Sequence, residues 1–314
     1  MIEVKNLLKK YGNHVAVDDL SFTVEDGQIL GFLGPNGAGK STTMNILTGY
    51  ISSTEGTVTI DGHDIFEEPE EAKKCIGYLP EQPPLYMDMT VYEYLRFVAE
   101  LKGVKKNERA KMIRNIIDET KLVEVQNRLI HHLSKGYKQR VGIAEALMGY
   151  PKVIILDEPT VGLDPSQIIE IRDLIKKLAK NHTVILSSHI LSEVSAVCDH
   201  VMIINKGKLI VSDTPDNLIN YTKQRSGLRL IVKGTKDIVK EILDSIGAIT
   251  DTKLEKEEDG LVYLTAYTSE KEDIREMVFY AMAEAKCPIF GMELLDLSLE
   301  DVFLELTTEQ KGDK

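Results

Sequence analysis

The segment 34–41, with the sequence GPNGAGKS, constrains the fold of this chain more than any other feature. It matches the pattern GxxxxGK[ST] in full, directly after the apolar run 29–33 and ahead of the helical pattern 42–47. In such a loop the glycines let the backbone wrap closely around phosphate oxygens, and the helix N-terminus adds amide donors. Lys40 is suited to neutralise phosphate charge, and the Ser41 hydroxyl is suited to ligate Mg²⁺. We expect a nucleotide to contact Gly34, Asn36, Gly37, Ala38, Gly39, Lys40, Ser41 and Thr42.

Two carboxylates follow a second apolar run. The sequence VIIL at 153–156 leads directly into Asp157 and Glu158. We expect both side chains at the carboxyl edge of a buried strand, where open α/β sheets bind their ligands. Asp157 could support Mg²⁺, and Glu158 could orient or deprotonate water. The alternative is that the two carboxylates only cap a helix, which is less probable in a chain that also has a complete phosphate-binding loop.

Composition limits the class of protein. The chain has 314 residues, so we expect two domains or one large domain with an appendage. Hydrophobic residues make up 43% and charged residues 28%, which is typical of a globular protein. The formal net charge is −12, whereas binding to nucleic acid without sequence preference needs a basic face. We therefore expect no nucleic-acid partner.

Cysteine spacing and hydropathy indicate the redox state of the thiols and whether the chain spans a membrane. Cys75, Cys198 and Cys287 form neither a CxxC pair nor a Cys/His cluster, so we expect reduced thiols and no zinc site. No uninterrupted apolar stretch approaches the roughly 18 to 20 residues that span a bilayer, and the N-terminus lacks a signal-peptide core. The chain itself is expected to be soluble.

The first 220 residues read as an α/β domain with a mainly parallel sheet, because short apolar runs alternate with longer helical patterns. The predicted strands are 28–33, 153–156, 183–187 and 200–205. A helical insertion is predicted at about 90–150, and it opens with a capping box formed by Thr90 and Glu93. Four apolar side chains at helical spacing are expected to pack inward: Tyr94, Leu95, Val98 and Leu101.

Residues 226–314 read as a separate, small α+β domain. The predicted elements are a strand at 228–233, a helix at 237–246, two strands flanking the polar turn 257–260, a helix at 271–285 and a strand at 289–295. This β-α-β-β-α-β order is the ferredoxin-like order. A last amphipathic helix is predicted at 299–306, with Ser298 as its N-cap.

A third motif is the segment 133–140, LSKGYKQR, which precedes an amphipathic pattern. Its serine, Ser134, forms with the next free amides a helix N-terminus that can bind an anion, although a serine in this position, taken alone, is more often an ordinary N-cap. The phosphate-binding loop, this segment, the carboxylate pair, Gly162-Leu163-Asp164 and Ser187-Ser188-His189 resemble, in order and spacing, the ATP-binding subunits of ABC transporters. The resemblance covers roughly residues 1 to 220.

The resemblance implies roles for residues that are weak candidates by themselves. It makes Tyr11 the aromatic that stacks on adenine, and Gln82 the glutamine that senses Mg²⁺ and faces a membrane partner. It makes His189 the γ-phosphate contact and Asp164 the residue that crosses between subunits. Without the resemblance, Tyr11 is a core or surface side chain, Gln82 belongs to a loop, and His189 is a hydrogen-bonded histidine at a strand end. The other six histidines match no motif.

The family's signature also implies a contact across subunits. Ser134 and Gly136 would touch the ATP of the opposite subunit. Two positions depart from the common signature Leu-Ser-Gly-Gly-Gln, because Lys135 occupies the third and Tyr137 the fifth. We expect activity, since Ser134 and Gly136 are retained. Lys135 either adds a charge near the nucleotide or is a solvated lysine at a helix start.

This variant signature and the tail segment 298–306, SLEDVFLEL, resemble the ATPases of bacterial ABC-2-type exporters. The resemblance implies ATP hydrolysis with Mg²⁺, by a homodimer or a pair of closely related subunits, to power a separate membrane-spanning chain. It implies a cytoplasmic location, on the inner face of the cell membrane through that partner. The implied catalytic residues are Glu158, His189, Lys40 and Gln82, and the implied Mg²⁺ ligands are Ser41, Gln82 and Asp157.

Two other functions remain open at this point. A soluble ATPase of the same superfamily would not be coupled to transport, but translation factors of that kind carry two ATPase domains, and DNA-maintenance members insert a long coiled coil. Only 51 residues separate Gln82 from Ser134. A nucleotide-gated binding module would not hydrolyse ATP. The presence of Glu158 and His189, to which the resemblance gives catalytic roles, argues against this function.

Met87 and Met89 lie between Gln82 and the helical insertion. They could form an adaptable apolar surface for a helix of the membrane partner. The alternative is that both simply pack into the core.

Overall fold

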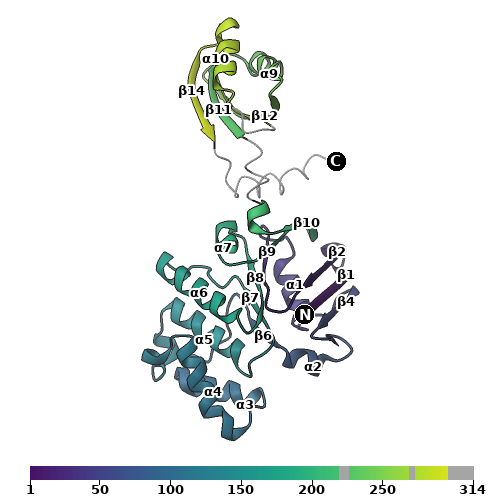
Figure 1. Ribbon diagram of the computed structural model, residues 1–314, viewed down its shortest axis with the longest axis vertical. Coiled ribbons are helices and arrows are strands. Elements are labelled where there is room, and N and C mark those ends of the chain that lie inside the picture. Colours follow the sequence, from purple (N-terminus) through teal and green to yellow (C-terminus); the bar gives the residue numbers. More distant parts are fainter. Residues whose placement is uncertain (219–225, 269–272, 296–314) are drawn as a thin grey trace. The chain divides into compact units, whose positions relative to one another are not determined.

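The structure is a computed structural model that describes residues 1–218, 226–268 and 273–295. The chain divides into two compact units, Met1–Pro215 and Asp216–Lys314, both shown in Figure 1. The sequence-based division into domains 1–220 and 226–314 stays a prediction, which a truncation can test.

The first unit contains a central six-stranded sheet with the order β10-β9-β3-β8-β7-β6. Its strands are β3 (Ile29–Leu33), β6 (Ile76–Leu79), β7 (Val153–Asp157), β8 (Thr183–Ser188), β9 (His200–Asn205) and β10 (Lys208–Asp213). All neighbouring pairs are parallel except β9 and β10, which are antiparallel. Every residue of β3, β7 and β8 is buried, as expected for parallel strands that are covered on both faces. The four strands predicted from the sequence are confirmed to within one residue.

A second, antiparallel sheet was not expected from the sequence. It has the order β2-β1-β4-β5 and consists of β1 (Ile2–Tyr11), β2 (His14–Val24), β4 (Glu55–Ile60) and β5 (His63–Asp64). Ile2 and Val4 on β1 and Val58 and Ile60 on β4 point to one face and are buried there. This period-two pattern is typical of a sheet with one covered face, so the first unit contains both a parallel and an antiparallel layer.

Helix α1 (Lys40–Leu47) packs within the core of the first unit. Its side chains Met44 and Leu47 share one apolar cluster with Leu7 of β1, Phe32 of β3 and Ile155 of β7. The cluster thus includes residues of both sheets as well as the helix. Burying apolar side chains on several sides of α1 fixes the position of its N-terminus, where the phosphate-binding loop ends.

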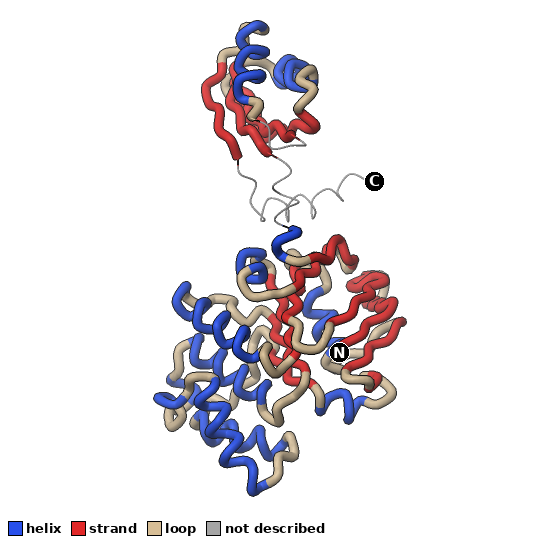
Figure 2. Tube along the Cα trace, viewed as in Figure 1, coloured by secondary structure: helices blue, strands red, loops and turns tan. Residues whose placement is uncertain are grey.

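The remaining helices of the first unit gather on the side away from β1, β2 and β4, as Figures 1 and 2 show. They are α3 (Val91–Leu101), α4 (Lys106–Glu119), the 3₁₀ turns η1 (Val123–Val125) and η2 (Ile130–His132), α5 (Lys135–Leu147) and α6 (Pro165–Leu178). Two short helices, α2 (Pro69–Lys74) and α7 (Leu191–Ser195), complete the unit. No helix among the described residues is both long and apolar enough to cross a membrane.

The capping box of α3 is confirmed, since the Glu93 amide donates to Thr90 Oγ1 and the Thr90 amide donates to Glu93 Oε2. Three of the four side chains predicted to pack inward are buried. Leu101 is 69% exposed, so that prediction was wrong. The helix ends at Leu101, the chain reverses at Gly103, and Val104 takes the inward position instead.

The second unit is a four-stranded antiparallel sheet with two helices. Its elements are β11 (Ser226–Lys233), α9 (Lys236–Asp244), β12 (Ile249–Glu258), β13 (Leu261–Thr268), α10 (Arg275–Glu284) and β14 (Ile289–Leu295). The sheet order is β12-β13-β11-β14, and its neighbouring strands are antiparallel. Leu230, Val262 and Met282 belong to a core of its own. The predicted terminal helix at 299–306 lies outside the described residues.

Candidate nucleotide-binding site

The loop between β3 and α1 requires glycine at two positions. Gly39 is the N-cap of α1 and has a φ of +106°, and a Cβ there would lie 2.4 Å from the Ala16 carbonyl oxygen. A Cβ at Gly34 would lie 2.6 Å from the Ile204 carbonyl oxygen. These close approaches leave the backbone of the loop, rather than side chains, to line the space above the helix N-terminus.

Lys40 is the buried cation of the loop, and its side chain is only 6% exposed. Its Nζ donates to the carbonyl oxygens of Gly34 at 2.8 Å and Pro35 at 3.4 Å. It also lies 3.5 Å from Glu158 Oε1. The ammonium group is therefore held at the mouth of the loop, beside a carboxylate.

The two carboxylates take different positions at the end of β7. Asp157 is buried and accepts a hydrogen bond from the Ser187 hydroxyl on β8. The same hydroxyl accepts from the Glu158 amide at 3.0 Å. Glu158 has a φ of +49°, which is uncommon for a residue other than glycine, and its Oε2 lies 2.9 Å from His189 Nδ1. Ser187 thus connects the strands that carry Glu158 and His189.

A cavity of about 410 Å³ opens between these groups. Nine residues proposed from the sequence line it: Tyr11, Asn36, Gly37, Gly39, Lys40, Ser41, Thr42, Glu158 and His189. Gly34 and Ala38 are buried, and so is Asp157; none of the three is part of the lining. The structure therefore brings most of the predicted nucleotide contacts to one place.

Five further residues line the cavity that were not predicted from the sequence: His14, Ala16, Pro35, Glu81 and Val161. His14 reaches the site because β1 and β2 form a tight hairpin in which Tyr11 is directly opposite His14. The two-residue turn Gly12-Asn13 between them was the available signal, since such a turn marks a hairpin. Tyr11 is half exposed, and Lys9 Nζ lies over its ring at 5.1 Å from the centroid.

Four predicted residues lie away from the lining of this cavity. Gln82 is exposed, and its neighbour Glu81 lines the cavity instead. Ser134 and Asp164 are exposed N-caps, and Gly136 borders a different cavity. The structure of one subunit does not join these residues to the phosphate-binding loop.

Ser134 and Asp164 begin two neighbouring helices. The Tyr137 amide donates to Ser134 Oγ at 3.4 Å, and the Gln167 amide donates to Asp164 Oδ1 at 3.0 Å. The Ser166 hydroxyl and then the Gln167 amide hold the pKa of Asp164 below its ordinary value, because both donate to the ionised form. Asp164 is thus a stable anion at the start of α6.

The donor set at the cavity fits Mg²⁺ bound together with a nucleotide. The described residues include no group of three or more His, Cys, Asp or Glu side chains that could hold a metal by themselves. Mg²⁺ in phosphate-transfer sites commonly takes one or two protein ligands and the rest from phosphates and water. The Ser41 hydroxyl lines the cavity and the Asp157 carboxylate is buried outside its lining, and these are the two donors that would hold Mg²⁺.

Comparison with known proteins gives consistent results. The family model described as "ABC transporter" matches residues 17–161. The bacitracin transport ATP-binding protein BcrA of Bacillus licheniformis is 36% identical, over 98% of this chain and 97% of its own length.

Solved structures of ABC ATP-binding proteins are also similar to this chain. The structure of an ATP-binding subunit of an ABC transporter superposes with a TM-score of 0.64 at 32% identity, covering 70% of this chain and 92% of that one. A dimeric ATP-binding cassette in a post-hydrolysis state, bound to ADP and Pi, superposes with a TM-score of 0.62 at 27% identity and covers 68% of this chain and 99% of that one.

Proposed function

Because this chain belongs to the family of ABC transporter ATP-binding subunits, we propose that it hydrolyses ATP to power a separate membrane-spanning exporter. One observation carries the catalytic part of the proposal. Glu158, the carboxylate after β7, lies within 3.5 Å of Lys40 Nζ and 2.9 Å of His189 Nδ1, at the cavity above the phosphate-binding loop.

These three side chains have distinct tasks in attack of water on the γ-phosphate. Phosphoryl transfer needs mainly positioning and neutralisation of charge. Lys40 neutralises the phosphates, His189 contacts the γ-phosphate, and Glu158 orients or deprotonates the water. When ATP binds, its phosphates can replace Glu158 as the partner of Lys40, which leaves the carboxylate free for water.

Mg²⁺ accompanies ATP in this proposal. It would neutralise and orient the β- and γ-phosphates when bound. Ser41 and Asp157 would be its protein ligands, with Gln82 as a third. The role of Gln82 is a prediction, since its side chain is exposed and is not part of the cavity lining.

A pair of subunits completes the site. Ser134, Gly136 and Asp164 are outside the cavity lining of their own subunit, and the first and last are exposed at helix N-termini. A helix N-terminus binds anions, so Ser134 is suited to the γ-phosphate of ATP held by the opposite subunit. ATP binding then closes the pair and hydrolysis reopens it, and this difference in affinity does the work on the membrane partner.

The membrane-spanning partner is a separate chain. The subunit works in the cytoplasm, on the inner face of the membrane, where that partner holds it. The bacitracin-transport relative supports a partner of the exporter kind. The second unit is a ferredoxin-like accessory domain, a view supported by its β-α-β-β-α-β order and the sheet order β12-β13-β11-β14.

The test is the substitution Glu158→Gln, which keeps the shape of the side chain but removes its charge. Hydrolysis should fall by roughly 10² or more if Glu158 is the general base or its equivalent. ATP binding should survive. The variant should accumulate as a dimer that grows with ATP and not with ADP, because ATP still bridges the two subunits.

Adding Ser134→Arg should dissolve this dimer by blocking the phosphate contact. Light scattering of both variants with each nucleotide is the measurement. Near-normal hydrolysis by the monomeric Glu158→Gln variant would overturn both the catalytic role and the shared site. A monomer that has lost hydrolysis would overturn only spontaneous pairing, and adding the membrane partner then shows whether that chain pairs the subunits.

A further inference from the structure

The variant signature contacts the segment 162–170 of its own subunit at three places. A Cβ at Gly162 would lie 2.2 Å from Lys135 Nζ, so the ammonium group rests directly against this glycine. A Cβ at Gly136 would lie 2.6 Å from the side-chain amide carbon of Gln167. The third contact is an ion pair between Arg140 and Glu170.

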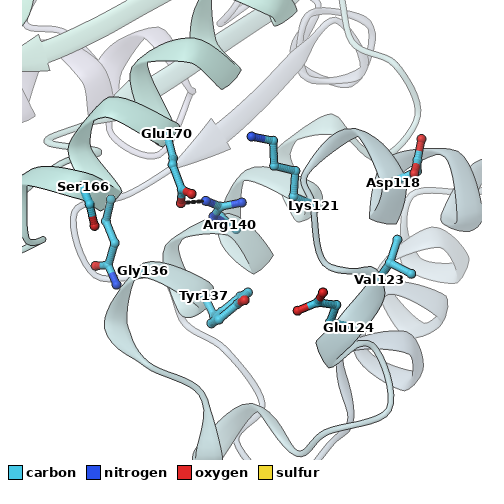
Figure 3. Close-up of a pocket in the computed structure, with 10 residues that line it drawn as sticks. Asp118, Lys121, Val123, Glu124, Gly136, Tyr137, Arg140, Ser166 and Glu170 are labelled. Carbon is cyan, nitrogen blue, oxygen red and sulfur yellow. Dashed lines mark hydrogen bonds and ion pairs between the residues drawn. The ribbon is translucent and has the colours of Figure 1, made fainter.

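Arg140 is the centre of this arrangement. Its side chain is 9% exposed, and its guanidinium group pairs with Glu170 of α6. The same group donates to the Thr120 carbonyl oxygen at 3.5 Å, and its Cζ lies 5.9 Å from the centroid of the Tyr137 ring. Figure 3 shows Arg140 and Glu170 joined, with the Tyr137 ring at the edge of the same cavity. One buried cation therefore connects α5 with α6 and with the end of α4.

The ion pair joins α5 and α6 at equal distances from their N-caps, Ser134 and Asp164. Arg140 is six residues after Ser134, the N-cap of α5, and Glu170 is six residues after Asp164, the N-cap of α6. At 1.5 Å per residue, each partner is about 9 Å along its helix from the cap. Fixing this pair fixes Ser134 relative to Asp164.

The Lys135 contact involves the loop that leads from the catalytic carboxylate to α6. Gly162, against which Lys135 rests, lies between Glu158 and Asp164 in the loop that joins β7 to α6. The two departures from the common family signature, Lys135 and Tyr137, are thus both contact residues of this arrangement.

We propose that Lys135, Tyr137, Arg140 and Glu170 form a clamp that makes the signature and the Glu158 loop of one subunit move as one body. They are positioning residues for ATP hydrolysis, which act through Ser134 and the Glu158 loop. The clamp rests on the proposed function, because its purpose is to place Ser134 correctly for the opposite subunit when Glu158 is in place.

Glu170 is the partner to substitute, because its side chain is 49% exposed and borders a cavity of about 530 Å³, so its loss removes little apolar packing. Arg140 lines the same cavity and keeps the Thr120 carbonyl oxygen as a hydrogen-bond partner. We expect Glu170→Ala in the full-length chain to lower kcat for ATP hydrolysis about tenfold, the size of one lost charge-assisted contact. ADP affinity should stay within about twofold, since one subunit binds ADP through the phosphate-binding loop. The matched control is Asp173→Ala, an exposed acidic residue three positions later on α6, which should change neither quantity.

Tyr137→Gln restores the common signature residue and should also lower kcat without changing ADP affinity. A Glu170→Ala variant with the kcat of wild type would overturn the clamp. A parallel loss of ADP affinity would also overturn it, because that result indicates general damage instead of lost positioning. If Glu158→Gln abolishes hydrolysis while Glu170→Ala does not alter it, the clamp is wrong and the proposed function stands. If Glu158→Gln retains hydrolysis, the proposed function itself is wrong.

Discussion

At the scale of single residues, Lys40 and Glu158 depend on each other. Both side chains are buried, and the ammonium and carboxylate groups lie 3.5 Å apart. A buried charge is tolerated when it is paired, so each of these two side chains offsets the cost of burying the other. The pair explains how the Lys40 ammonium group can be buried in this loop.

Lys40→Ala should abolish ATP hydrolysis and weaken ATP binding, because the triphosphate loses its cation in the phosphate-binding loop. Phosphate release and ATP affinity are the measurements. Lys176→Ala, which removes an exposed lysine of α6, is the matched control and should behave like wild type. Turnover at the wild-type rate in Lys40→Ala would show that the site has been placed wrongly.

At the scale of elements, α3 and α5 are joined by a polar contact inside the helical insertion. The Tyr94 hydroxyl donates to Glu145 Oε2 at 2.6 Å. Burial raises the pKa of Glu145 above its ordinary value of 4.5, and the Tyr94 hydrogen bond opposes this rise because it favours the carboxylate. A carboxyl group with a raised pKa lowers the free energy of unfolding as the pH rises from 4.5 through its folded pKa.

Tyr94→Phe removes the donor and should lower the free energy of unfolding by about 1 to 3 kcal/mol. The loss should be larger at pH 8, where the carboxylate is ionised without its donor, than at pH 5. Urea unfolding at both pH values measures it, with Tyr92→Phe, a partly exposed neighbour, as the control. An equal loss at both pH values would mean that the hydroxyl contributes only through packing.

The segment before α3 is the element that we expect to meet the membrane partner. The His131 amide donates to the Met87 carbonyl oxygen at 3.0 Å, yet the Met87 side chain is 41% exposed. Met89 is partly buried, and Tyr86 beside them is 54% exposed. The backbone of this segment is held while its apolar side chains face outward, as a docking surface requires.

Met87→Glu should uncouple transport while basal ATP hydrolysis and folding stay unchanged. Transport and ATPase activity are measured with the membrane partner present. Met89→Glu tests the same surface at a more buried position and should destabilise the protein as well. A folded Met87→Glu variant with normal transport would exclude this surface, and an unfolded one would show that Met87 belongs to the core.

At the scale of the whole molecule, each unit has its own core. Among the described residues, the buried members of the apolar cluster around α1 lie within 2–204, and those of the second unit's cluster lie within 228–287. All residues that line the nucleotide cavity belong to the first unit. Each unit is thus described with apolar packing of its own, and the first unit supplies the described residues of the nucleotide cavity.

Removal of the residues after 220 should leave a folded protein that binds ADP with an affinity within about twofold of the full-length chain. Dimerisation or regulation should change instead. Soluble yield, circular dichroism and ADP binding test this. An insoluble fragment would show that the tail completes the ATPase core.

The sequence by itself determined the features that depend on neighbouring residues. The loop 34–41 and the strand ending in Asp157 and Glu158 could be predicted because glycine conformation, helix ends and buried strands leave local patterns. The capping box of α3 is another case, since its two hydrogen bonds join residues only three positions apart.

Tertiary structure alone decided which distant side chains meet. His189 is 31 residues from Glu158 and meets it because β7 and β8 pair in parallel and Ser187 links their ends. The pairing of Arg140 with Glu170 likewise depends on how α5 and α6 pack. Periodicity indicates which face of an element is buried, but not which element covers that face. Contacts between distant side chains therefore could not be predicted from the sequence. The same holds for the second sheet, whose strand β2 brings His14 to the nucleotide cavity.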